Sequence, residues 1–264
     1  MTAAAHPALQ SDRLTPPKAV LMADGGGCLG LGGVRTRIAL IGDKDLGFVT
    51  HRELDAAVAL FPDWVQPRWI GSDSAEARAL AGFDGLWVIP GSPYRDDEAV
   101  IAAIGHALDS RTPFLGTCGG FQYAALALAQ RLAGVCSPAH AELQPTAADP
   151  VVAGLACSLI GEQRKVTCVP RTRLVEICGS EPFMGFHWCN YGLAAGFVER
   201  LEAAGVVVSA RAPDAGVEGI EVPAHPFFVA TLFQPQVGAL AGRSLHPLIQ
   251  AFLGAAKASP APVQ

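Results

Sequence analysis

An apolar run followed by a stretch with helical spacing occurs three times in the first half of the chain. The apolar runs are RIALIG, DGLWVIPG and TPFLGT, which start at residues 37, 84 and 112. In the stretch after each run, apolar residues recur every three to four positions, as in an amphipathic helix. Apolar strands that alternate with such helices indicate a parallel sheet covered on both sides. The sequence therefore predicts an α/β fold, a mostly parallel sheet with helices on both faces, in a single domain.

The second half of the chain carries β-rich runs and two further helical patterns. The β-rich runs are GVVVSAR, VEGIEVP and FFVATLFQ, and helices are expected in NYGLAAGFVERLEAAG and SLHPLIQAFLGAA. We expect the domain to cover residues 36–257, preceded by a flexible leader over 1–35 and followed by a tail over 258–264. The leader contains MADGGGCLGLGG, which lacks the Lys and Ser or Thr that a phosphate loop needs after its last glycine.

Charge and cysteine content restrict the class of protein. The net charge is -5 and no basic cluster occurs, so nucleic acid is not an expected partner. No apolar run reaches the roughly 18 to 20 residues that cross a bilayer, so no membrane partner is expected. Seven cysteines are scattered without a CxxC pair or a secretory signal, which favours reduced thiols in a cytoplasmic protein without a metal or other cofactor.

The stretch FLGTCGGFQ, residues 114 to 122, points to chemistry at Cys118. In an open parallel sheet, the tight turn from a strand into a helix lies at the carboxyl edge, where ligands bind. Glycines on both sides of the cysteine permit a strained backbone, and the helix N-terminus behind it favours a thiolate, the reactive form of a thiol. The alternative is that Cys118 is a small buried hydrophobic residue.

PFLGTCGGFQ resembles the nucleophile elbow of the class I, triad-type glutamine amidotransferases, and residues 36 to 257 are similar to the glutaminase domain of CTP synthase. DGLWVIPGSPYR is similar to the oxyanion loop of that family, and GVEGIEVPAHPFFVATLFQPQ to its C-terminal signature. In the family, the cysteine attacks the side-chain amide of glutamine, and a thioester forms as ammonia leaves. The resemblance implies that Cys118 is the nucleophile and that Gly119, with Gly91 or Ser92, donates N–H groups to an oxyanion.

The chain departs from the family pattern where the proton acceptor is expected. The family has a Phe-His-Pro-Glu segment, whereas this chain reads Phe233, Gln234, Pro235 and Gln236. A carboxamide cannot accept and return a proton near neutral pH, so the inherited base is expected to be absent.

Two further departures concern substrate binding. Ungapped matching puts Cys136 where the family has a glutamate, and Trp188 where it has an arginine. Loss of both charged groups would weaken glutamine binding, so a substrate other than free glutamine is expected. The resemblance implies a ligand-binding wall made of Ser92, Gly120, Gln122, Cys136, Trp188, Gln234 and Gln236.

Several other residues are candidate partners of Cys118. His187 is the first candidate for a substitute base, but it neighbours Trp188, and adjacent strand residues point to opposite sides. His51 is a weaker candidate, His225 is expected in a turn, and solvated or capping roles are expected for Glu218 and Glu221. Cys136 and Cys189 near Cys118 would allow a metal or redox site, although no ligand spacing supports a metal.

Two functions therefore stay open at the level of sequence. The first is an enzyme in which Cys118 forms a thioester or thioimidate with a small molecule, with a possible synthase or other biosynthetic partner protein. The second is a ligand-binding or regulatory protein that keeps the pocket and has lost turnover.

Overall fold

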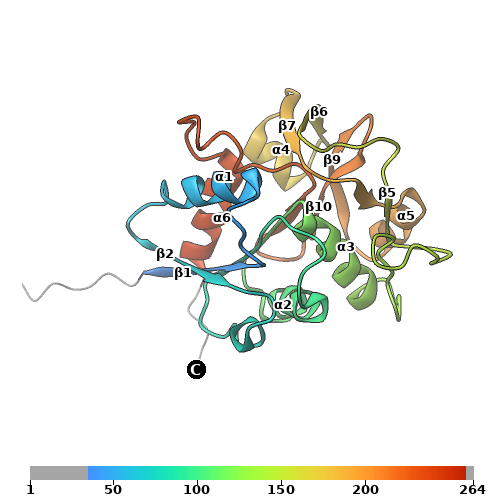
Figure 1. Ribbon diagram of the computed structural model, residues 1–264, viewed down its shortest axis with the longest axis horizontal. Coiled ribbons are helices and arrows are strands. Elements are labelled where there is room, and N and C mark those ends of the chain that lie inside the picture. The colour runs from blue at the N-terminus through green and yellow to red at the C-terminus, as the bar shows by residue number, and fades with distance from the viewer. Residues whose placement is uncertain (1–34, 260–264) are drawn as a thin grey trace, which may run out of the picture. The chain divides into compact units, whose positions relative to one another are not determined.

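A nine-stranded sheet forms the centre of the domain (Figure 1). Its strand order is β2-β1-β3-β4-β11-β10-β9-β6-β7. The computed structural model describes residues 35–259, so the glycine-rich segment and almost all of the expected leader lie outside the described residues. The parallel strands are β1 (Thr36–Ile41), β2 (Val65–Ile70), β3 (Gly85–Val88), β4 (Phe114–Thr117) and β11 (Phe228–Thr231). An antiparallel extension is formed by β10 (Gly216–Glu221), β9 (Val207–Ala212), β6 (Glu162–Cys168) and β7 (Phe183–His187).

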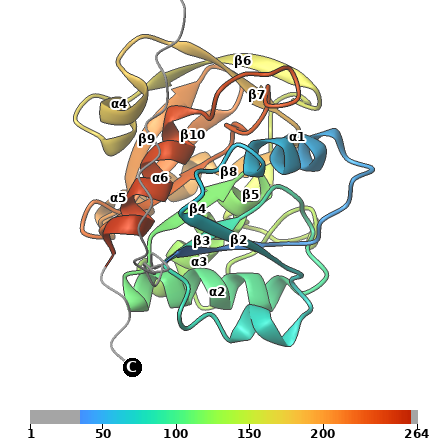
Figure 2. The ribbon, with the colours of Figure 1, turned by 90° about the vertical axis from the view of Figure 1, so that its left-hand side faces the viewer.

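Helices cover both faces of the sheet. They are α1 (Val49–Val58), α2 (Asp97–Ser110), α3 (Gly119–Arg131), α4 (Arg173–Cys178), α5 (Ala195–Ala203) and α6 (Pro247–Ala258), with a short 3-10 helix, η1 (Ala75–Arg78). Figure 2 shows α2 and α3 below the parallel strands and α1 and α6 above them. The predicted α/β class with a mostly parallel central sheet and helices on both faces is confirmed.

Strand β1 shows how the sequence produces this layering. Ala39 and Ile41 pack into the core between the sheet and helices α2 and α3, whereas Ile38 and Leu40 pack into the core between the sheet and helices α1 and α6. All four side chains are fully buried. A strand with apolar residues on both faces must be covered on both faces, which is why the apolar runs predicted the central strands.

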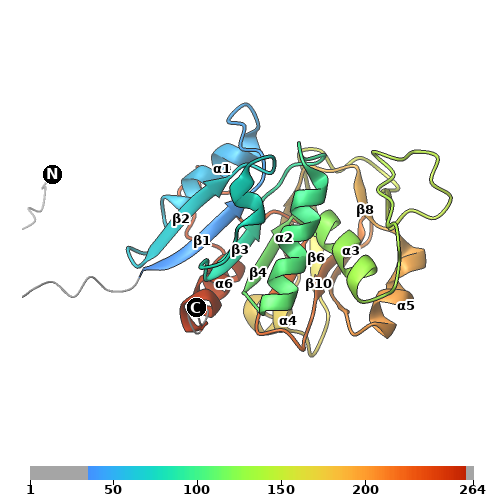
Figure 3. The same cartoon turned by 90° about the horizontal axis from the view of Figure 1, so that it is seen from below.

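The region between residues 140 and 195 differs in part from the sequence-based prediction. The expected helix over NYGLAAGFVERLEAAG begins only at Ala195, because Tyr191–Leu193 forms β8, which pairs with β5 (Val152–Gly154). The tertiary pairing of β8 overrides the helical pattern of its residues. Figure 3 shows β8 beyond α3, at the same end of the domain as α5. Among the described residues, no helix has the length and apolar character that a bilayer span requires.

Candidate active site

Cys118 occupies the turn between β4 and α3 with a strained backbone. Its φ is 54° and its ψ is -108°, a positive-φ conformation that a non-glycine residue rarely adopts. The turn is anchored by the Cys118 N–H, which donates to the Thr231 carbonyl at 2.9 Å. The Trp87 indole N–H also donates to the Thr117 hydroxyl at 3.0 Å, just before the cysteine. The strand-to-helix turn predicted from FLGTCGGFQ is thus present, with the thiol at its tip.

The glycines around Cys118 are required by close backbone approaches. A Cβ on Gly119 would lie 1.9 Å from the Gly91 carbonyl oxygen, and one on Gly120 would lie 2.2 Å from the Val88 carbonyl oxygen. Such distances are far inside van der Waals contact, so only glycine lets the start of α3 pass this close to the loop after β3. Gly91 itself presents its carbonyl oxygen to the turn.

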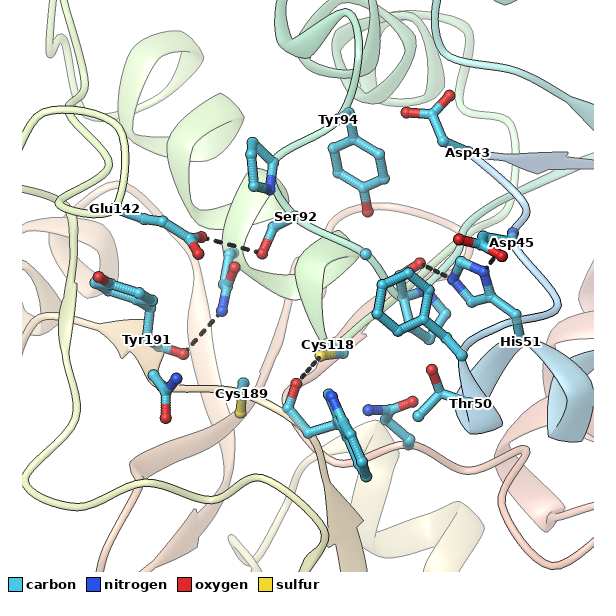
Figure 4. Close-up of a pocket in the computed structure, with 18 of the residues that line it drawn as sticks. Asp43, Asp45, Thr50, His51, Ser92, Tyr94, Cys118, Glu142, Cys189 and Tyr191 are labelled. Carbon is cyan, nitrogen blue, oxygen red and sulfur yellow. Dashed lines mark hydrogen bonds between the residues drawn. The ribbon is translucent and has the colours of Figure 1, made fainter.

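A cavity of about 440 Å³ lies in front of Cys118 (Figure 4). Its walls come from loops at the carboxyl ends of the parallel strands, where ligands of open α/β folds bind. Its lining includes His51, Gly91, Ser92, Cys118, Gln122, Glu142, Trp188, Cys189 and Gln234. The Cys118 thiol is only 6% exposed and donates to the Trp188 carbonyl at 3.6 Å.

The two carboxamides of the C-terminal signature are bonded to each other. Gln236 Nε2 donates to Gln234 Oε1 at 2.8 Å, and both residues are 2% exposed. Gln234 lines the cavity. Its backbone is fixed by a bond from its N–H to the Phe186 carbonyl at 2.9 Å, and Glu53 Oε2 on α1 accepts from the N–H groups of Gly238 and Leu240. Gln234 and Gln236 are therefore held in a fixed arrangement, and their carboxamides cannot act as a proton acceptor near neutral pH.

His187 is paired with a carboxylate and is not among the residues that line the cavity. Its Nε2 lies 2.9 Å from both carboxylate oxygens of Glu218, and both side chains are fully buried. The candidate base is thus committed to a buried pair, as the alternation of strand side chains beside Trp188 indicated. The expectation of a solvated or capping Glu218 was wrong. Glu221 does cap, because it accepts from the N–H groups of Arg173 and Leu174 at the start of α4.

His51 lines the cavity, yet neither ring nitrogen is free to take a proton from Cys118. Nδ1 accepts from the Asp45 N–H at 2.8 Å, which leaves the proton on Nε2, and Nε2 donates to the Pro90 carbonyl at 2.8 Å. His225 is bonded in the same way, to the Phe227 N–H and the Ala107 carbonyl. Both histidines position loops, as expected for His225.

Cys136 is exposed on the segment after α3, so its expected place in the ligand-binding wall was wrong. The ungapped match of this segment to the family was wrong because the local sequence does not determine the path of such a long loop. The same loop instead carries Glu142 to the cavity, where Ser92 Oγ donates to it at 3.4 Å. Burial is the main cause that raises the pKa of Glu142. Trp188 lies at the cavity as expected and is 38% exposed.

Gln122 is held by both ends of its amide. Its Nε2 donates to the Tyr191 carbonyl at 2.8 Å, and its Oε1 lies 3.2 Å from His140 Nε2. His140 Nδ1 accepts from the Glu142 N–H at 3.2 Å, so Nε2 carries the proton that Oε1 accepts. One neutral histidine therefore links the Glu142 loop to α3.

This arrangement predicts acid sensitivity. Burial lowers the pKa of His140 from 6.5 to about 4, so between these values the unfolded chain binds a proton that the folded chain does not. Stability should rise with pH across this window and be lost as pH falls through it, by about 3 kcal/mol for a fully buried group. Urea unfolding between pH 4 and 7 should show a shallower pH slope for His140→Asn, which keeps an acceptor for the Glu142 N–H. An unchanged slope would contradict this role.

Comparison with known proteins gives the family. Residues 64–237 match the family model described as "Glutamine amidotransferase class-I". This chain belongs to the class I glutamine amidotransferase family. It is 32% identical over 219 residues to CTP synthase from Pyrobaculum calidifontis, which covers 78% of this chain and 40% of that protein. CTP synthase from Trichormus variabilis is also 32% identical, over 226 residues, with the same shares covered.

The chain thus spans 40% of the length of these two relatives. The solved glutaminase domain of Trypanosoma brucei CTPS with bound acivicin matches with a TM-score of 0.71 and 24% identity, covering 85% of this chain and 95% of that one. This structural match supports the assignment of the fold. The chain is a class I glutamine amidotransferase domain that resembles the glutaminase domain of CTP synthase.

Proposed function

We propose that Cys118 is a nucleophile that forms a covalent adduct with a small molecule other than free glutamine, at an amide, ester or nitrile carbon. The observation that carries this proposal is the position of the thiol, at a positive φ, at the head of α3 and in the wall of a cavity. A residue keeps a strained backbone when the surrounding structure enforces it, and such strain is concentrated at functional sites.

In this proposal the sulfur forms a bond to the electrophilic carbon, and negative charge moves to the attached oxygen or nitrogen. The Gly119 N–H belongs to the first residue of α3 and has no acceptor within the helix, so it can donate to that atom. Gly91 faces Gly119 with its carbonyl oxygen, so the donor role falls to Gly119. Glu142 at the cavity supplies a carboxylate that suits a positively charged group on the ligand.

Free glutamine is disfavoured by two positions. Trp188 provides no charge for a substrate carboxylate, and the Gln234 amide cannot carry a proton from the thiol to a leaving amine. Turnover by hydrolysis should therefore be slow. The alternative, a binding protein without turnover, is favoured by the mutually bonded carboxamides of Gln234 and Gln236. A biosynthetic partner protein stays a prediction.

Competitive alkylation tests the nucleophile. At pH 6, limiting iodoacetamide followed by peptide mapping should label Cys118 before the exposed Cys136 and Cys157, although Cys118 is buried. Exposure alone predicts the opposite order, because accessible thiols of equal reactivity are alkylated first. Cys118→Ser should lose only its own label. If the order of labelling follows exposure, Cys118 is no activated nucleophile and the binding alternative stands.

Ammonia release from glutamine should stay at the background given by Cys118→Ser. A rate well above that background would contradict the assignment of Gln234 and Trp188 to the base and anion-binding positions.

A further inference from the structure

A second thiol shares the cavity with Cys118. Cys189 lies just after β7, is 7% exposed and lines the same cavity (Figure 4). The carbonyl that accepts from Cys118 Sγ, at 3.6 Å, belongs to the peptide unit that joins Trp188 to Cys189. The Cys118 sulfur is therefore in contact with the backbone that carries the second thiol.

The two thiols have different electrostatic environments. Cys118 stands directly before the first residue of α3, at the N-terminus of that helix. The pKa of Cys189 is raised, first by its side-chain interaction with Cys118, then by burial, with a further contribution from the Glu218 carboxylate. Cys189 is thus held as a protonated thiol in the wall of the cavity that Cys118 also lines.

The site lacks the proton relay of hydrolysis, whereas a redox reaction of Cys118 needs no such relay. Amide hydrolysis requires a base that takes the thiol proton and returns it to the leaving amine. When a thiol reduces a hydroperoxide, the thiol still loses its proton, but this proton ends on the released alcohol, so no protein group has to return a proton to a leaving amine. A buried neighbouring thiol then has a chemical use, because it can condense with the oxidised sulfur.

We propose that Cys118 and Cys189 form a redox pair that reduces a small hydroperoxide and closes into a reversible disulfide in the cavity. Cys118 Sγ attacks the peroxide, the O–O bond breaks, and sulfenic acid and ROH form, so sulfur loses two electrons and the peroxide gains them. The Cys189 sulfur then attacks the sulfenic sulfur, the Cys189 proton passes to the departing hydroxyl group, an S–S bond forms and water leaves. A small dithiol reductant restores both thiols and becomes a disulfide. The proposal shares only the nucleophile with the proposed function.

The chain offers a matched control pair. Cys168 and Cys178 also interact through their side chains, and this interaction is the first cause that lowers the pKa of Cys168 and raises that of Cys178. They pack in the core beneath α6 and stand apart from the residues that line the cavity in front of Cys118. Each pair thus contains a cysteine whose pKa is shifted by interaction with its partner, whereas only Cys118 and Cys189 line the cavity.

The test uses the full chain and hydrogen peroxide as the probe. After equimolar peroxide and a quench with N-ethylmaleimide, peptide mapping should find a disulfide linking Cys118 to Cys189, lost again on treatment with dithiothreitol. Cys189→Ser and Cys189→Ala, each checked for folding by thermal unfolding, should instead accumulate a Cys118 sulfenic acid that dimedone traps. The double variant Cys168→Ser with Cys178→Ser should form the 118–189 disulfide as the wild type does.

Absence of the 118–189 linkage in oxidised wild type would overturn the redox pair, as would a preferred disulfide between Cys168 and Cys178. The two proposals fail separately. Rapid alkylation of Cys118 without a disulfide rejects the redox pair alone, whereas a disulfide without adducts from amides, esters or nitriles rejects the acyl chemistry alone.

Discussion

Gly120→Ala is expected to destabilise the domain by about 3 kcal/mol, at the upper end of the cost of overpacking a core. The added Cβ would lie 2.2 Å from the Val88 carbonyl oxygen and 3.2 Å from the Val88 Cβ. Neither atom can move easily, because Val88 belongs to β3, which pairs with β1 and β4. Since the clash displaces the start of α3, reactivity of Cys118 should fall together with stability. Urea unfolding and the alkylation rate measure the two effects.

Gly196→Ala is the matched control. Gly196 is the second residue of α5, as Gly120 is the second residue of α3, and a Cβ there would meet no atom within 4 Å. Alanine should therefore be neutral or stabilise the domain by up to about 1 kcal/mol. Equal unfolding midpoints for the two variants would contradict the close approach between α3 and β3.

The double variant Gln234→His with Gln236→Glu should activate Cys118 strongly. The present bond from Gln236 Nε2 to Gln234 Oε1, at 2.8 Å, indicates that the two side chains are already within bonding distance. An imidazole oriented by a carboxylate in their place would supply a general base, which contributes roughly 10²- to 10⁴-fold to catalysis. Two rates should be measured in the double variant and in the wild type: the rate of Cys118 alkylation near pH 6 and the rate of ammonia release from glutamine.

The single variants separate proton transfer from general effects of substitution. Gln234→His alone has a less well oriented imidazole and should gain less than the double variant. Gln236→Glu alone buries a carboxylate beside an amide, so it should lower stability without activating the thiol. If the double variant alkylates no faster than the wild type, position 234 is not within reach of the sulfur.

The central strands and the elbow could be predicted because their signals are local. RIALIG and TPFLGT are apolar on both faces, and the glycines flanking Cys118 stand within two residues of it. Strand β2 gave no such signal, because VQPRWI lies at the sheet edge, contains Pro67 and buries fully only its first and last residues.

The rest of the site depends on contacts between distant segments. Glu142 reaches the cavity on a loop whose length ungapped matching ignores, and β8 forms only because it pairs with β5. The partner of His187 is Glu218, 31 residues away. These contacts form only when the sheet is assembled, so the sequence pattern around either partner does not predict them.

The Glu53 carboxylate holds part of the cavity wall without using the side chain at position 234. It holds the loop beyond Gln236 through two backbone N–H groups, and Gln234 itself is fastened to Phe186 by its main chain. None of these bonds uses the side chains of Gln234 or Gln236. The side chains at positions 234 and 236 could therefore be exchanged during evolution, with a change in the chemistry of the site, while these backbone hydrogen bonds are kept.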